Sequence, residues 1–195
     1  MSGIYHGTKF GFIQSAIYDQ MGVALEGRLA NASDINLCDS ISVAETDGIG
    51  VGLGVKIAAL SGAKKAGVND QCIKLPVGTD TAADFAGIVV RTDSGHTDAN
   101  NRTYVAKEEQ ATVLREKRVG GRVWVKAQGA ITTGGNLYWV IADDSVSGLT
   151  AGGFTGTAVT NKTVKLDSVS VVAGAAKGGL ALIEIGTLPS ASSES

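Results

Sequence analysis

Two runs of alternating apolar residues, separated by a glycine-rich segment, stand between Arg118 and Asp144. In the first run the alternating residues are Val123, Val125 and Ala127. In the second run they are Leu137, Trp139 and Ile141. Because successive side chains of a strand point to opposite faces, this spacing predicts two half-buried strands of an antiparallel sheet, joined as a hairpin.

Both tryptophans of the chain belong to these two runs. The segment between them, Gly129 to Asn136, carries no acid, base or metal ligand. The largest side chains are therefore placed where packing requires them, and the stretch indicates a structural role rather than catalysis.

The abundance of turn-forming residues extends the prediction of β-strands to the whole chain. The 195 residues include 27 glycines and only 2 prolines, so the turns are built with Gly, Asn, Asp and Ser. Glycine adopts the positive φ angles that tight hairpins need. Short apolar runs recur between these turns with weak helical periodicity, which predicts an all-β fold: an antiparallel sandwich, jelly-roll-like, or a small barrel.

Three segments follow from composition: an extended N-terminal arm (1–20), a β-domain (21–186) and a disordered tail (187–195). The arm holds four of the ten aromatic residues: Tyr5, Phe10, Phe12 and Tyr18. Aromatic rings are costly to leave in water, so the segment either folds back as an edge strand or docks on a partner. Its glycines favour a docking arm, and these four aromatic residues are the candidate partner-binding residues.

Three further patterns predict local structure. Gly48, Gly50, Gly52 and Gly54 alternate with apolar residues, which on one strand would place every glycine on one face, packed closely against a backbone or a ring. Their spacing is not the G-x-G-x-x-G of dinucleotide sites. The apolar register shifts at Asp167–Ser168, which predicts a bulge or bend. Gly179–Ile185 is apolar on both faces apart from Glu184, as expected of a buried closing strand.

Charge and hydropathy narrow the classes of partner. The 17 basic and 19 acidic residues give a formal charge of −2, which argues against a nucleic-acid partner. No apolar run is long enough to span a membrane and no signal peptide is visible, so we expect a protein that is made without export. Cys38 and Cys72 have no metal-binding spacing; free thiols are expected, and a disulfide is an alternative.

Candidate chemistry is sparse. His96 lies near Asp93 and Asp98, but a single histidine in a polar loop is typical of solvated surface. Asp143 and Asp144 are adjacent, so on a strand they would face opposite ways, although a loop could bring them together with Asp167 around calcium. No motif of a nucleophilic enzyme is present. We expect no enzyme activity, no cofactor and no metal.

The second half of the chain resembles the capsid cement, or decoration, proteins of tailed bacteriophages. The resemblance is carried by Gly87–Val90, Val113–Arg115, Arg122–Val125 with Gly129, and Gly134–Gly135 with Leu137–Val140. It extends over roughly residues 85–185. The sequence departs from the pattern where Lys117–Gly121 lengthens a turn and where the loop at 93–103 is longer.

The resemblance implies a homodimer or homotrimer on the outside of the capsid, where it would clamp neighbouring major capsid subunits together. The partners it implies are the major capsid protein and other copies of the same chain. Two alternatives remain open at this point: a β-domain of a tail or baseplate, and a carbohydrate-binding β-sandwich in which Trp124 or Trp139 stacks on a sugar.

Overall fold

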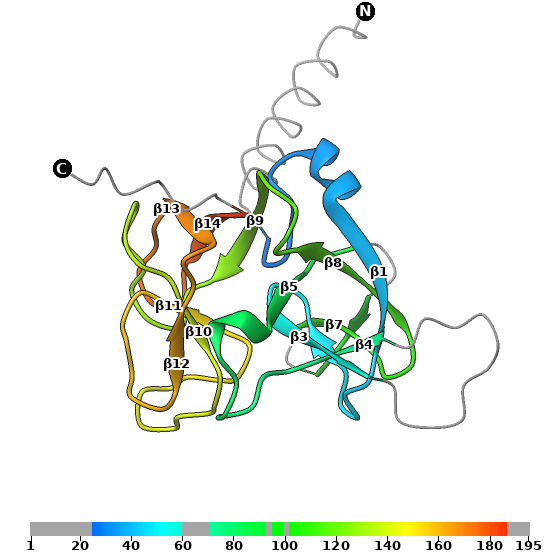
Figure 1. Ribbon diagram of the computed structural model, residues 1–195, viewed down its shortest axis with the longest axis horizontal. Helices are drawn as coiled ribbons and strands as arrows, with labels where there is room; N and C mark the ends of the chain where they lie inside the picture. The colour runs from blue at the N-terminus through cyan, green and yellow to red at the C-terminus, as the bar shows by residue number, and fades with distance from the viewer. Residues whose placement is uncertain (1–24, 60–70, 93–94, 100–101, 187–195) are drawn as a thin grey trace, which may run out of the picture.

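A computed structural model describes residues 25–59, 71–92, 95–99 and 102–186 (Figure 1). The predicted arm (1–20) and tail (187–195) lie outside these residues, as do the four aromatic residues of the arm. Both assignments therefore stay predictions.

Among the described residues the secondary structure is almost entirely β. The elements, in chain order, are η1 (Ala32–Leu37), β1 (Cys38–Val43), β2 (Ile49–Gly50), β3 (Gly54–Ala59), β4 (Gln71–Lys74), η2 (Ala82–Asp84), β5 (Phe85–Val89), β6 (His96–Thr97), β7 (Thr103–Val105), β8 (Gln110–Arg115), β9 (Gly121–Lys126), β10 (Tyr138–Val140), β11 (Phe154–Thr155), β12 (Thr163–Lys165), β13 (Val169–Ala173) and β14 (Leu180–Ile185). The all-β prediction is confirmed.

The first half of the chain forms a small closed barrel in the strand order β1-β4-β3-β5-β8, with β8 pairing back to β1. Four of the five strand pairs are antiparallel, but β1 and β4 are parallel, with Ser42 opposite Cys72. The predicted small barrel is therefore present, with one parallel pair among its antiparallel strands. Two parallel strands need a crossover connection rather than a hairpin. Here the chain between β1 and β4 contains β3. Branched residues fill the inside, including Ile41, Val55 and Val113.

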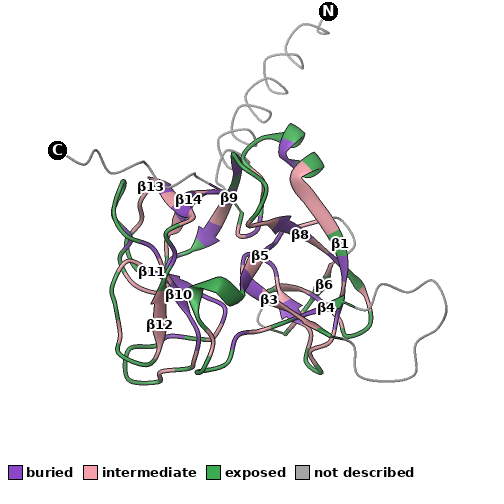
Figure 2. Ribbon diagram, in the orientation of Figure 1, coloured by how far each residue is buried: buried purple, intermediate pink, exposed green. Residues whose placement is uncertain are grey.

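The second half adds two three-stranded sheets, ordered β13-β14-β9 and β11-β10-β12. A third small sheet, β2-β7-β6, belongs to the barrel half. In Figure 1 the barrel strands and the strands from β10 to β14 lie on opposite sides of the molecule, with β9 between them at the top. Figure 2 shows buried residues concentrated where these two halves meet.

The predicted hairpin between Arg118 and Asp144 was wrong in its pairing. β9 pairs with β14, whereas β10 pairs with β11 and β12, so the two strands belong to different sheets. The intervening chain makes bridges of its own, from Ala127 to Phe154 and from Ile131 to Ala175. The apolar residues of both runs are buried as predicted. Alternation determines which face of a strand is buried, but it does not determine the neighbouring strand.

The alternating glycines do not share one strand. β2 ends at Gly50, the chain turns at Gly52, where φ is +80°, and β3 begins at Gly54. The predicted close approach to a ring is present at Gly54. A Cβ atom there would lie 2.7 Å from Nε1 of Trp139 and 2.9 Å from Cε2 of Phe85.

An aromatic cluster joins the two halves around that contact. The fully buried Trp139 lies edge-on to Phe85, with ring centroids 5.2 Å apart, and its Nε1–H donates a 3.3 Å hydrogen bond to the carbonyl oxygen of Gly54. Phe154, from β11, lies 6.3 Å from the Phe85 ring. The cluster therefore connects β3 and β5 of the barrel to β10 and β11.

The other two patterns agree with the structure. The bend predicted at Asp167–Ser168 is where the chain leaves β12 and enters β13 of another sheet. The predicted closing strand is β14, which lies between β13 and β9, but it is buried on one face only, because every second side chain is partly exposed. Its one charged residue, Glu184, pairs with Nε of Arg122 at 2.5 Å.

Replacing Gly54 with alanine should lower the free energy of unfolding by about 1–3 kcal/mol, because the new methyl group would overlap the Trp139 and Phe85 rings. Urea unfolding measures the change. Gly78→Ala is the matched control, since a Cβ atom there would meet only Ala142, at 3.6 Å. Equal midpoints for the two variants would show that the aromatic contact at Gly54 does not constrain the fold.

Candidate functional site

A short segment, Glu26–Ala30, lies between the two halves, and we call it the strap. It runs antiparallel to β9, with Leu29 opposite Val123. On its other side it contacts the barrel half, since the backbone N–H of Arg91 donates to the carbonyl oxygen of Gly27 at 2.7 Å.

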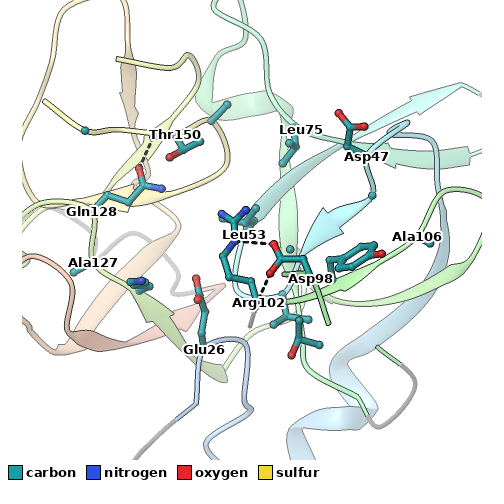
Figure 3. Close-up of a pocket in the computed structure, with 18 of the residues that line it drawn as sticks. Glu26, Asp47, Leu53, Leu75, Asp98, Arg102, Ala106, Ala127, Gln128 and Thr150 are labelled. Carbon is teal, nitrogen blue, oxygen red and sulfur yellow. Dashed lines mark hydrogen bonds and ion pairs between the residues drawn. The ribbon is translucent and has the colours of Figure 1, made fainter. Parts of the chain in front are cut away.

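Beside the strap, the two halves enclose a groove of about 820 Å³ (Figure 3). The barrel half contributes residues from the segments around β2 and β7, and the other half contributes the end of β9 and two turns. The labelled lining residues in Figure 3 are Glu26, Asp47, Leu53, Leu75, Asp98, Arg102, Ala106, Ala127, Gln128 and Thr150.

Charges of both signs line the groove. Burial raises the pKa of the Glu26 carboxyl, while the positive charges of Lys126, Arg91 and Arg102 oppose that rise. Nε of Arg102 lies 3.1 Å from a carboxylate oxygen of Asp98. The mixture gives no strong electrostatic preference for a phosphate or a metal cation.

On the other wall, hydrogen bonds hold the turns. Oε1 of Gln128 accepts the backbone N–H of Thr150 at 2.8 Å, and Nζ of Lys177 donates to the carbonyl oxygen of Ser147 at 2.9 Å. These polar side chains stabilise loops, and they do not converge on one point where a reacting atom could lie.

His96 is an exposed surface residue paired with a neighbour in space. Its Nε2 lies 2.8 Å from Oε1 of Glu109, and its ring is 5.5 Å from the ring of Tyr104. The hydrogen bond from His96, followed by one from the backbone of Ala106, lowers the pKa of the Glu109 carboxyl. Asp93 lies outside the described residues, and Asp98 pairs with Arg102 instead.

The acidic residues considered for calcium support separate turns. Asp143 accepts the backbone N–H of Ala151 at 2.8 Å. Hydrogen bonds from Ser147 lower the pKa of Asp144, and Asp167 pairs with Lys165 at 2.8 Å. Across the part of the chain that the structure describes, no group of three or more His, Cys, Asp or Glu side chains is arranged to hold a metal.

The two tryptophans differ in exposure. Trp139 is fully buried and cannot stack on a sugar, whereas Trp124 is half-buried on β9. A carbohydrate platform needs an accessible ring, so the only candidate left from that hypothesis is Trp124.

Both thiols are free, and no disulfide joins Cys38 to Cys72. Burial, followed by the negative charges of Asp34 and Asp39, raises the pKa of the Cys38 thiol to about 11. A thiol with so high a pKa is a poor nucleophile at neutral pH.

Within the described residues, no helix is long and apolar enough to cross a membrane.

Comparison with known proteins places this fold. A family model described as "Structural cement protein (E217 gp24/Pam3 gp6)" matches residues 13–186. The chain belongs to the structural cement protein family. This confirms the resemblance seen in the sequence, and it extends the match into the first half of the chain, where sequence motifs were weak. Membership gives the chain a structural role in the capsid of a phage.

One solved structure similar to this cement protein is titled "The capsid of Myoviridae Phage XM1". The TM-score is 0.53 at 17% sequence identity, covering 77% of this chain and 82% of that chain. At this identity the similarity establishes a shared fold. No curated protein sequence matches the chain significantly.

Sequence reasoning missed both the strap and the groove. The strap is a five-residue segment that is joined to β9 and to Arg91 by hydrogen bonds of its backbone, and backbone pairing leaves no pattern in the sequence. The groove is lined partly by glycines from turns that are distant in sequence: Gly48, Gly50, Gly148 and Gly178.

Replacing Glu26 with glutamine should raise the free energy of unfolding at about pH 7 and leave it unchanged near pH 4. The pKa of this carboxyl is higher in the folded protein than its ordinary value of 4.5, so folding favours the protonated form. The cost of ionisation is therefore present above the folded pKa and disappears as the pH falls below the unfolded value.

Urea unfolding of the cement protein across this pH range measures the difference, with Glu116→Gln, outside the groove, as the control. A stability difference for Glu26→Gln that stayed constant from pH 4 to about pH 8 would contradict the role of burial at Glu26.

Proposed function

We propose that this cement protein binds the outside of a phage capsid as a homo-oligomer and holds neighbouring major capsid subunits together. The observation that supports this most directly is the match of the family model over residues 13–186. The shared fold with a chain of a phage capsid favours a place on the capsid over one on the tail or baseplate.

The chemistry of the described residues is compatible with a protein that acts by binding. Its polar groups support turns and strand ends, and its formal charge of −2 does not favour binding to packaged DNA. Affinity would come from apolar surface buried against the shell and against sister copies. Single contacts contribute modestly, but repetition over a shell multiplies them through avidity.

The attachment residues we propose are those of the aromatic arm: Tyr5, Phe10, Phe12 and Tyr18. Tyr and Phe side chains bury large apolar areas with few rotatable bonds, which makes them effective interface anchors. The β-domain then serves as a rigid body from which the arm extends.

Deleting residues 1–20 should weaken binding to expanded capsids by about tenfold or more, because it removes four aromatic anchors. Co-sedimentation with capsids at increasing protein concentration measures the affinity. Circular dichroism and thermal melting check that the β-domain stays folded. The matched control is deletion of residues 187–195, which contain no aromatic residue.

A variant with Tyr5, Phe10, Phe12 and Tyr18 all replaced by alanine separates the aromatic side chains from the length of the arm. If either the truncated or the substituted protein decorated capsids with the affinity of the full chain, the proposed anchoring would be wrong. Labelled protein seen on tails instead of capsids would overturn the proposed location.

A further inference from the structure

The strap is hydrogen-bonded to β9 along its length. The N–H of Gly27 donates to Trp124 O at 2.8 Å, and the N–H of Trp124 donates to Arg28 O at 2.9 Å. A third bond, 2.9 Å long, runs from Ala30 N–H to the carbonyl oxygen of Arg122. The strap is thus a fourth strand-like segment at the edge of the β13-β14-β9 sheet.

The opposite edge of the strap is bound to the barrel half through hydrogen bonds from Arg91. Arg91 follows β5, and its backbone N–H donates to Gly27 O at 2.7 Å. Its Nε donates to the carbonyl oxygen of Glu26 at 3.2 Å, while Nη1 donates to Oγ1 of Thr103 at 2.7 Å. The same few residues are therefore attached to both halves of the molecule.

Strand directions determine how a pull on the N-terminus would load these bonds. The strap and β14 both run antiparallel to β9 and flank it, so they run parallel to each other. Glu26 lies near the Lys126 end of β9, whereas Ile185, at the end of β14, pairs with Gly121 at the other end. The chain therefore enters and leaves this sheet at opposite ends.

We propose that the strap is a mechanical clasp, which transmits tension from the N-terminal arm into both halves of the domain. A pull along the strap loads its bonds to β9 together, in shear, so that none yields before the others. The bonds to Arg91 pass part of the same load to the barrel. This inference rests on the proposed attachment through residues 1–20, since that attachment is what would place the arm under tension.

Optical tweezers on the isolated full-length protein test the clasp in two pulling directions. Handles at the two termini load the strap in shear. A second pair of handles, at the N-terminus and at position 177, loads the strap from one end. The handle at position 177 is attached through Lys177→Cys in a Cys38→Ser, Cys72→Ser background. Lys177 is exposed and lines the groove beside Glu26, so this geometry peels the bonds one after another.

We expect the unfolding force to be about twofold higher between the termini than between the N-terminus and position 177, because forced unfolding follows the unfolding barrier along the pulling direction. Equal forces in both directions would overturn the clasp. This comparison uses the intact strap, so it does not depend on a destabilised variant.

Two substitutions then remove hydrogen bonds of the strap. Ala30→Pro removes the N–H that donates to the carbonyl oxygen of Arg122. Arg91→Met removes the side-chain donors to Glu26 and to Thr103 and keeps an unbranched apolar side chain. Each should lower the force between the termini. The control, Ala82→Pro, is at the first residue of η2 after an extended Thr81, where proline is tolerated.

A force between the termini that was the same in Ala30→Pro, Arg91→Met and the control would also overturn the proposal. The outcome is separate from that of capsid attachment, because the tweezers experiment contains no capsid. A strong clasp with no loss of binding on deleting residues 1–20 would disprove the anchoring and leave the mechanical property established.

Discussion

The position of Trp139 is the constraint on which the two halves of this cement protein depend. Its indole packs against Gly54, which has no side chain, and the indole N–H donates to the carbonyl oxygen of that glycine. Phe85 of the barrel lies edge-on to the indole, and Phe154 of β11 lies edge-on to Phe85 in turn. A large ring with one polar atom is stable in a core only when that atom is paired, so the barrel and the C-terminal sheets are fixed in one relative position.

The two halves of this cement protein are joined in two ways. The core joins them through side chains, and the strap joins them a second time through backbone hydrogen bonds. The groove is the space left beside these two connections. The function we propose, holding neighbouring capsid subunits together, would need a body that does not shear internally, and two connections between the halves favour such a body.

Sequence periodicity predicted the burial of individual strands well and their pairing poorly. Val123, Val125, Trp139 and Ile141 are buried as the alternation indicates, yet β9 and β10 belong to different sheets. Burial depends on each residue and its near neighbours, whereas pairing depends on chain segments distant in sequence. The strap has no side-chain pattern at all, so only the three-dimensional structure shows it. The family, in contrast, was visible in short strand motifs.

The closing pair of the barrel has a consequence for how the chain folds. β1 pairs with β8, so that Cys38 faces Leu114, and the strap pairs with β9. Both N-terminal segments must wait for partners synthesised much later, and contacts of such long sequence separation slow folding. β1 lacks its partner β8 until residue 115 has been synthesised, and the strap lacks its partner on β9 until residue 124 has been synthesised. During that interval these strand edges are unpaired, which favours aggregation.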